Sequence, residues 1–307
     1  MKVHKNSDYR SDKPTVVALG CFDGVHVGHR TVISTAVDIA KKLSAKSAVW
    51  TFEFPPKNYF SSEPVPLLTT ALEKQTLIER LSVDDLICVS PCPEIFSISP
   101  EDFFKKILIE QLSATHIVCG FNYTFGKKGT GNVSALKKLC EKANVGITVI
   151  EPVDTDGISV SSSQIRAALL DGNAALANKL LGYNFSLTAP IVGSQHLATK
   201  LGFPTANQLF TENKLVPKKG VYVSRIILGE AVKYGITNVG VRPTANDHTL
   251  CAETHIFDFD QCLYDKVITV EFLDFIREEK QFSSLDELTR QINDDIETAK
   301  KFINSIQ

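Results

Sequence analysis

The stretch TVVALGCFDGVHVGHRTVISTAVDIAKKL (residues 15–43) gives the clearest indication of the fold of the first half of the chain. It opens with TVVALG (15–20), a continuous apolar run typical of a strand that is buried on both faces. A glycine-rich turn follows, and the stretch then continues as a predicted helix over 30–43. The apolar residues that we expect on the buried face of this helix are Val32, Ile33, Ala36, Ile39 and Leu43.

The same alternation continues to about residue 152. Apolar strand-like runs recur at 47–52, 85–90, 115–120 and 146–152, and helical patterns at 71–81, 100–112 and 133–143. The helix at 100–112 has Ser99 as its predicted N-cap and Pro100 at its first position. Repeated strand–helix units predict a parallel sheet with helices on both faces, which binds ligands beyond the carboxyl ends of its strands.

The pattern changes after about Leu181. Strand-like runs separated by turn residues predict an antiparallel sheet or barrel. They cover 186–193, 220–229, 231–240, 249–260 and 266–276. An amphipathic helix over 283–303, capped by Ser283 or Ser284, ends the pattern. We expect two domains, 1–182 and 183–307.

Composition excludes several classes of protein. The 307 residues are 43% hydrophobic and 22% charged, which excludes a disordered chain. The net charge of −2 gives no general attraction to nucleic acid or to anionic membranes. Seven cysteines without a CxxC pair favour a reducing compartment. With no apolar run of membrane-spanning length and no signal-like segment, we expect a cytoplasmic protein.

The turn GCFDGVHVGH (20–29) predicts a phosphate site. Its glycines allow the backbone to approach a ligand closely, and the N-terminus of the following helix attracts anions. His26 and His29 are three residues apart, so both can donate to phosphate oxygens from one side. The alternatives are half of a zinc site or a purely structural turn. We expect Asp23 to fix the loop by accepting bonds from backbone amides.

Two further segments carry candidate ligands. Ser161–Ser163 can cap the helix that follows them, and Arg166 would lie near this cap, where it can meet an anion. The alternative is an ordinary cap with a solvated arginine. In KLGFPTANQ (200–208), Thr205 and Asn207 present hard oxygen atoms suited to Mg²⁺ together with nucleotide phosphates. A plain turn is the alternative there.

The first half resembles a known enzyme family. GCFDGVHVGH resembles the signature of the HxGH nucleotidyltransferase superfamily, and GFNYTFG (120–126) and VSSSQIR (160–166) follow as they do in the adenylyltransferase half of prokaryotic bifunctional riboflavin kinase/FAD synthetases. This resemblance implies a Rossmann-like domain in which His26 and His29 contact the ATP phosphates. The other ATP- or flavin-binding residues that it implies are Gly20, Phe22, Gly24, Gly28, Asn122, Ser162, Ser163 and Arg166.

The second half resembles the riboflavin kinase domain through GFPTAN, GVY, NVGVRPT, ETHI with DFD, and IREEK. The resemblance implies an antiparallel barrel in which Thr205 and Asn207 coordinate Mg-ATP. It also implies that Glu253 is the general base for the ribityl hydroxyl of the flavin, a role that suits a carboxylate. The alternative for Glu253 is an outward-facing strand residue, since Ala252, Thr254 and Ile256 alternate on the opposite face.

The chain departs from the pattern of this family at a few positions. TFEFPP (51–56) has Pro55 where the family usually carries a histidine. Ala198 and Thr199 replace a glycine–arginine pair before LGFPTAN, and Lys200 or Lys218 could supply the lost charge. The sequence LYD (263–265) replaces LYG.

These observations predict a bifunctional transferase that phosphorylates riboflavin to FMN and then adenylylates FMN to FAD, releasing pyrophosphate. Its partners would be riboflavin, FMN, ATP and Mg²⁺, with no nucleic acid and no membrane, and the oligomeric state stays open. One alternative is a riboflavin kinase with a weak adenylyltransferase, favoured by Pro55. Another is an adenylyltransferase with a poor kinase, favoured by Ala198 and Thr199. A third is a flavin-binding regulator without activity.

Overall fold

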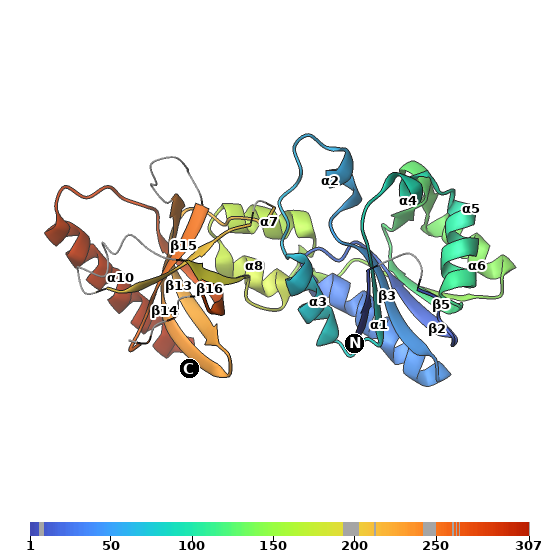
Figure 1. The fold of residues 1–307 in the computed structure, drawn as a ribbon, viewed down its shortest axis with the longest axis horizontal. Helices are drawn as coiled ribbons and strands as arrows, with labels where there is room; N and C mark the ends of the chain where they lie inside the picture. Colours follow the sequence, from blue (N-terminus) through green and yellow to red (C-terminus); the bar gives the residue numbers. More distant parts are fainter. Residues whose placement is uncertain are drawn as a thin grey trace. The chain divides into compact units, whose positions relative to one another are not determined.

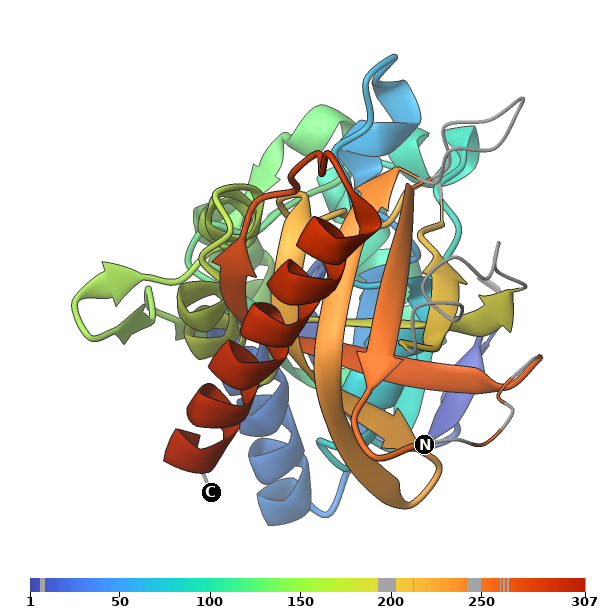
Figure 2. The ribbon, with the colours of Figure 1, turned by 90° about the vertical axis from the view of Figure 1, so that its left-hand side faces the viewer.

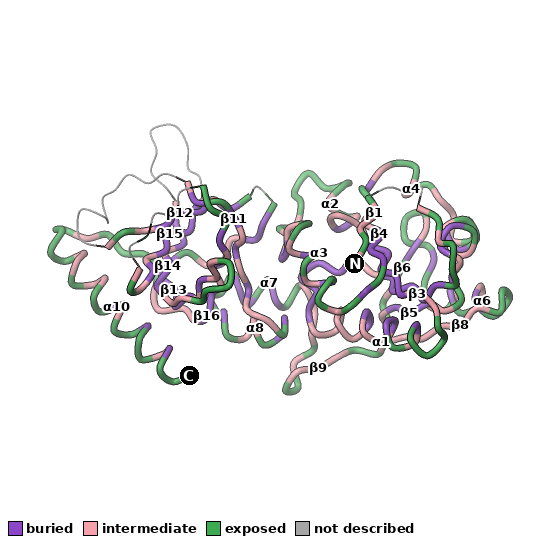
Figure 3. The backbone as a smooth tube through the Cα atoms, turned by 60° about the horizontal axis from the view of Figure 1, so that its bottom comes forward, coloured by how far each residue is buried: buried purple, intermediate pink, exposed green. Residues whose placement is uncertain are grey.

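The computed structural model describes residues 1–5, 9–192, 203–211, 213–241, 250–259, 261, 263 and 265–306. The chain forms two compact units, Met1–Ser162 and Ser163–Gln307 (Figure 1). Each unit has its own buried apolar core, as the purple segments along the strands of each unit show in Figure 3. A domain boundary after residue 182 stays a prediction.

The first unit is built on a six-stranded sheet in which every neighbouring pair of strands is parallel. This confirms the expected parallel sheet. An additional edge strand, β1, was not expected from the sequence. In spatial order the strands are β1 (Lys2–His4), β4 (Asp85–Val89), β3 (Lys46–Phe52), β2 (Thr15–Leu19), β5 (Ala114–Gly120) and β8 (Gly146–Ile150).

Helices cover both faces of this sheet, as predicted. On one face, α1 (Val27–Leu43) and α3 (Ala71–Glu79) pack against side chains such as Val16 and Leu86. On the other, η1 (Phe103–Gln111) and α6 (Val133–Lys142) pack against Val17 and Ile117. Short elements follow several strands: α2 (Pro56–Phe60), α4 (Pro93–Ser97), α5 (Pro100–Asp102), β6 (Thr124–Phe125), η2 (Lys127–Gly129), β7 (Gly131–Asn132), β9 (Asp154–Thr155) and β10 (Ile158–Ser159).

Two expectations about helices are corrected by the structure. Leu43, expected on the buried face of α1, is 53% exposed because the helix ends there, at a left-handed Ser44. Val37 and Ala40 are buried instead. The predicted helix at 100–112 does begin with Ser99, whose hydroxyl accepts a bond from the Asp102 N–H at 3.0 Å. From Phe103 onward, however, it continues as the π-helix η1.

The second unit contains a closed six-stranded barrel in which every neighbouring pair is antiparallel, which confirms the predicted barrel. One of its strands, β12, covers residues that the sequence indicated as a turn, because pairing with β15 extends them. In spatial order the strands are β11 (Ser186–Val192), β12 (Thr205–Leu209), β15 (Leu250–Ile256), β14 (Ala231–Val241), β13 (Gly220–Leu228) and β16 (Val267–Arg277).

Among its described residues, this unit has three helices: α7 (Ser162–Leu170), α8 (Ala174–Leu181) and α10 (Leu285–Ile306). The apolar side of α10 packs on β13 and β14, and it lies across the barrel in Figure 2. Arg277 fixes this helix through a two-pronged ion pair with buried Asp295, the shortest N–O distance being 2.7 Å. Within the described chain, no helix is long and apolar enough to cross a membrane.

Candidate functional site

The first candidate site is the loop between β2 and α1. In the sheet, β2 pairs with β3 on one side and with β5 on the other, so the order of the strands reverses around it. A ligand crevice forms at such a switch point, beyond the carboxyl ends of the strands. The predicted phosphate loop therefore lies where this fold binds ligands.

The backbone of the loop is strained at two residues that are not glycine. Phe22 has a φ of 51° and Val25 a φ of 35°, beside Gly24 at 85°. A positive φ is costly for a β-branched residue, and such strain persists where a functional site requires it. The ring of Phe22 is buried and packs on Gly20, where an added Cβ would lie 2.6 Å from it. Phe22 thus supports the turn with its side chain, and its predicted contact with ATP stays a prediction.

The two histidines of the loop lie together, as their spacing predicted. Their rings stack with centroids 3.5 Å apart and an angle of 16° between the planes. His26 is also the N-cap of α1, because its Nδ1 accepts a bond from the His29 N–H at 3.3 Å. Gly28 leaves room for this arrangement, since an added Cβ would meet the His26 ring at 3.3 Å. The capping role was missed, because histidine is not a usual cap.

Both imidazoles are neutral near pH 7. Burial lowers the pKa of His26 to about 4. Burial, followed by the neighbouring His26 and Lys74, lowers the pKa of His29 well below its usual value. A neutral His26 that accepts at Nδ1 carries its proton on Nε2, which can donate to a phosphate oxygen. The Nδ1 atom of His29 is buried without a hydrogen-bond partner among the described residues.

Asp23 anchors the loop, which confirms its predicted role. Its carboxylate accepts bonds from the N–H groups of Leu68 at 3.0 Å and Thr69 at 3.2 Å. The Gly24 N–H donates to the Thr69 hydroxyl at 3.1 Å. The hydroxyl of Ser162, the first residue of α7, donates to the Asp23 carbonyl at 3.0 Å. The structure therefore brings Ser162 to the loop, as predicted.

The other residues predicted for this site lie on other elements. Asn122 is exposed in the turn after β5, at the carboxyl edge of the sheet. Pro55 is the N-cap of α2 and makes no side-chain capping bond. Ser163 and Arg166 lie on α7, which is described with the second unit. The binding roles of Asn122, Ser163 and Arg166 stay predictions.

The second candidate site is a row of polar residues across three barrel strands. Asn207 on β12 lies directly opposite Glu253 on β15, and Glu253 lies opposite Asn238 on β14. Thr205, two residues before Asn207, is on the same face of its strand. The structure thus brings together the three residues predicted for the kinase site. It adds Asn238, which the sequence analysis missed because it lies on a different strand.

Asn207 carries the clearest sign of a ligand. It is 1% exposed, yet its Oδ1 has no hydrogen-bond partner within the described ranges. A buried carbonyl oxygen without a donor is costly unless a ligand satisfies it. The Nδ2 of Asn207 lies 3.4 Å from the Thr205 hydroxyl, so the amide oxygen is the atom left over. An amide oxygen beside a hydroxyl fits a hard cation such as Mg²⁺.

Glu253 lies on the face of its strand opposite the barrel interior, in agreement with the alternation seen in the sequence. Ala252 and Thr254 are fully buried, and the Thr254 hydroxyl bonds that of Thr237 at 2.9 Å inside the barrel. Glu253 itself is half-buried on the opposite face. On that face, the His255 Nδ1 lies 3.0 Å from the Pro204 carbonyl and so holds the segment that precedes Thr205. This role of His255 was missed in the ETHI motif.

The departures from the kinase pattern lie partly within the described residues. Ala198, Thr199 and Lys200 lie outside the described residues. Lys218 forms an ion pair with Glu278 at 2.9 Å, so its charge is already balanced. Asp265, which ends the LYD sequence, has a φ of 60°, a conformation that a glycine would adopt with less strain. In the part of the chain that the structure covers, no group of three or more His, Cys, Asp or Glu residues could hold a metal.

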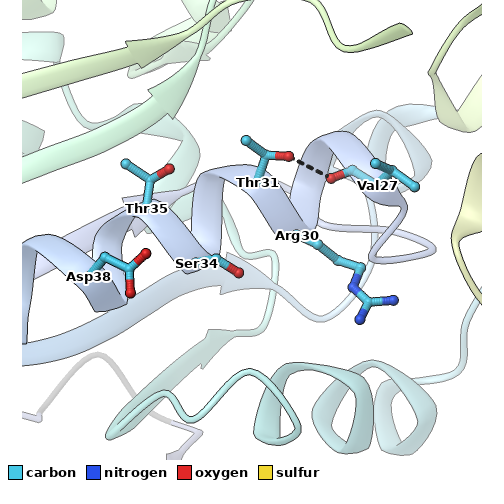
Figure 4. A pocket seen from close by; sticks show the side chains of 6 residues that line it. All are labelled: Val27, Arg30, Thr31, Ser34, Thr35 and Asp38. Carbon is cyan, nitrogen blue, oxygen red and sulfur yellow. Dashed lines mark hydrogen bonds between the residues drawn. The ribbon is translucent and has the colours of Figure 1, made fainter. Parts of the chain in front are cut away.

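A hollow of about 390 Å³ lies on α1 (Figure 4). It is on the side of the helix away from the sheet, and Val27, at the start of α1, is the lining residue that belongs to the predicted phosphate loop. The Thr31 hydroxyl donates to the Val27 carbonyl at 3.0 Å there. None of the residues predicted to bind ATP or flavin lines the hollow. Its lining residues are Val27, Arg30, Thr31, Ser34, Thr35 and Asp38.

Comparison with known proteins agrees with this division into two sites. The family model for FAD synthetase matches residues 8–164, and the model for riboflavin kinase matches residues 181–303. The bifunctional riboflavin kinase/FMN adenylyltransferase of Bacillus subtilis is 34% identical over 298 residues, covering 95% of this chain and 94% of the relative. The Escherichia coli K12 protein of the same name is 33% identical over 289 residues, covering 94% and 92%.

A solved structure matches the whole fold. A crystal structure named as a macrolide-efflux protein, from Streptococcus pneumoniae, has a TM-score of 0.87 and 30% identity, and the match covers 97% of this chain and 98% of that one. The efflux role in that name is stated for the streptococcal protein alone. On its family models and its relatives, this chain belongs to the bifunctional riboflavin kinase/FMN adenylyltransferase family.

Proposed function

We propose that the barrel phosphorylates riboflavin to FMN with Mg-ATP, and that the first unit adenylylates FMN to FAD with a second ATP. The observation that carries the proposal is the presence of two separate candidate sites in one chain. One is the loop with the stacked His26 and His29, and the other is the row of Asn207 and Glu253. The names of the relatives and of both family models support it.

Adenylyl transfer occurs at the loop between β2 and α1. An oxygen of the FMN phosphate attacks the α-phosphorus of ATP, and the bond to pyrophosphate breaks. The imidazole N–H groups of His26 and His29, together with the N-terminus of α1, stabilise the negative charge on the phosphate oxygens. Both histidines are neutral, so they act as hydrogen-bond donors and not as acids. Ser162, Ser163 and Arg166 bind the triphosphate from the start of α7.

The flavin ring of FMN binds at an aromatic surface near the end of β3. Phe52, the last residue of that strand, stacks on Phe96 of α4 at 6.0 Å. Phe60 of α2 lies 4.8 Å from Phe96 and is 69% exposed. Large exposed aromatic side chains favour contact with a planar apolar ring. Tyr59, which contacts both Phe60 and Phe96, extends this surface.

Phosphoryl transfer occurs on the barrel. Glu253 accepts the proton of the terminal ribityl hydroxyl as that oxygen attacks the γ-phosphorus of ATP, and the bond from that phosphorus to ADP breaks. Thr205 and Asn207 would hold Mg²⁺, and the unpartnered Oδ1 of Asn207 supports this assignment. When bound, the cation would neutralise charge on the phosphates. The side chains of Asn207, Glu253 and Asn238, which form the row, orient riboflavin and ATP for this transfer.

A riboflavin kinase with a weak adenylyltransferase is the second candidate. Pro55 favours it, because this position offers no side-chain donor to a phosphate or a flavin. An adenylyltransferase with a poor kinase and a regulator without activity are the remaining candidates from the sequence.

A single assay separates these candidates. Purified protein is incubated with riboflavin, ATP and Mg²⁺, and the flavins are separated by chromatography at successive times. The proposal predicts FMN first and FAD later. Formation of FMN alone supports the riboflavin kinase with a weak adenylyltransferase. If no FMN is made from riboflavin but supplied FMN is converted to FAD, the adenylyltransferase with a poor kinase is supported. Flavin binding without any consumption of ATP would identify the regulator.

A further inference from the structure

A buried lysine lies next to the phosphate loop and has no role in the mechanism above. Lys74 belongs to α3 and is 2% exposed. Its ammonium group donates to the backbone carbonyls of Cys21 at 3.2 Å, Phe52 at 2.8 Å and Glu53 at 3.2 Å. These bonds use all three N–H donors of the group. No carboxylate forms an ion pair with Lys74 among the ion pairs of the described residues.

The three carbonyls belong to the carboxyl ends of two neighbouring strands. Cys21 follows β2 and begins the phosphate loop, and its carbonyl also accepts the Thr51 hydroxyl at 2.9 Å. Phe52 is the last residue of β3, and Glu53 follows it. Lys74 therefore links the start of the loop to the adjacent strand. An apolar side chain could fill the same space without the cost of burying a charge, so the charge itself requires an explanation.

The charge of Lys74 acts on the histidines of the loop. His26 from the same loop and Lys74 from α3 are the charged or titratable groups that act on His29, and both lower its pKa. The carboxylate of Asp23 is bound by the N–H groups of Leu68 and Thr69. The site thus combines two uncharged imidazoles with one buried ammonium group that is held by three backbone carbonyls.

We propose that Lys74 is a positioning residue that supplies the positive charge of the phosphate loop, while His26 and His29 bind the triphosphate as hydrogen-bond donors. This inference rests on the proposed adenylyl transfer. The ammonium group acts through the Cys21 carbonyl and through His29, and it attracts the anionic triphosphate to the end of β2. The barrel site requires none of these contacts.

The test compares Lys74→Met with Lys74→Gln. Met fills a similar volume without charge or donors, whereas Gln keeps two N–H donors but no charge. We expect both variants to lower kcat/KM for FAD formation from FMN by roughly 100-fold. We also expect riboflavin phosphorylation by the same molecules to change less than about twofold, because the barrel is a separate unit. Lys42→Met, at an exposed lysine of α1, is the matched control.

A second measurement separates the charge from a structural role. Histidine side-chain NMR follows the titration of His29 in the wild type and in each folded variant. Loss of the neighbouring charge raises the pKa of His29, so its titration moves to higher pH in both variants. If Lys74→Met does not fold, the Gln variant alone decides the question.

The outcomes are distinct. An unmoved His29 titration, or wild-type FAD formation by Lys74→Gln, would overturn the inference. In either case the wild type still makes FAD, so the proposed function stands. If the wild type makes no FAD, it is the proposed adenylyl transfer that fails.

Discussion

The two candidate sites are built in different ways. The phosphate loop is a contiguous segment, GCFDGVHVGH, and its geometry comes from strained backbone, a helix N-terminus and two stacked histidines. The barrel site is a row across three strands, in which register places Asn207 beside Glu253. The loop buries titratable side chains in their neutral form. The barrel combines a half-buried carboxylate with an unpartnered amide oxygen.

This difference predicts which substitutions should affect which reaction. A change in the loop should impair only adenylyl transfer, and a change in the row should impair only phosphorylation, because the loop lies in the first compact unit and the row lies in the second.

Replacing the base should have the largest effect. Glu253→Gln keeps the size of the side chain but cannot accept the hydroxyl proton. We expect riboflavin phosphorylation to fall by about a thousandfold, with FAD formation from supplied FMN unchanged. Both rates are measured by chromatography, with Glu297→Gln, an exposed carboxylate on α10, as the control. A kinase rate within tenfold of the wild type would exclude Glu253 as the base.

Replacing a loop histidine should have a similar but smaller effect on the other reaction. His29→Ala removes one donor to the phosphates and the ring that stacks on His26. We expect FAD formation to fall by about 500-fold, so that FMN accumulates from riboflavin. Equal loss of both activities would contradict the separation of the two sites, and it would point to unfolding or to a shared site.

Acid should destabilise the first unit through its buried histidines. The pKa of His26 is lowered from 6.5 to about 4 in the folded protein. Below pH 6.5 the His26 side chain of the unfolded chain binds a proton that the folded chain does not. The contribution of His26 to the free energy of unfolding therefore falls as the pH drops towards 4, and it is constant above pH 6.5. The loss due to His26 is at most about 3 kcal/mol.

Thermal unfolding at pH 4.5 and pH 7 checks this prediction. His26→Asn is the matched variant, because asparagine can cap α1 but does not titrate in this range. The variant should lose less of its stability in acid than the wild type does. Identical acid sensitivity of the two proteins would show that His26 is not buried in its neutral form.

Removing the unpartnered oxygen should have the smallest effect. Asn207→Ala deletes the buried Oδ1 that we assign to Mg²⁺. We expect kcat/KM of the kinase to fall about tenfold and the Mg²⁺ concentration for half-maximal rate to rise, because other ligands of the cation remain. Asn207→Asp, which keeps an oxygen there, should restore much of the Mg²⁺ dependence. An unchanged dependence in both variants would place the cation elsewhere.

The sequence predicted those parts of the fold that follow from local patterns. Continuous apolar runs identified the central strands, and helical spacing identified α1 and α3. The strand β12 was interpreted as a turn, because Pro204, Thr205 and Asn207 are common turn residues while pairing with β15 is a distant contact. Leu43 was wrongly expected on the buried face, because the apolar periodicity does not show where the helix ends.

The candidate sites were predictable to the same degree. The motif placed His26 and His29 together, and alternation placed Glu253 opposite the barrel interior. Lys74 could not be predicted, because its partners are backbone carbonyls of distant residues, which no residue pattern encodes. Asn238 joined the kinase site only through strand register. A cytoplasmic location and the boundary after residue 182 stay predictions.

Complementation between two inactive variants tests the separation of the sites most directly. Glu253→Gln and His29→Ala are each incubated with riboflavin, ATP and Mg²⁺, alone and as an equimolar mixture, and FAD is measured. We expect almost no FAD from either variant alone and rapid FAD formation from the mixture, because FMN made by one protein is adenylylated by the other. A mixture that makes no more FAD than its components, although each variant retains its other activity, would contradict two independent sites.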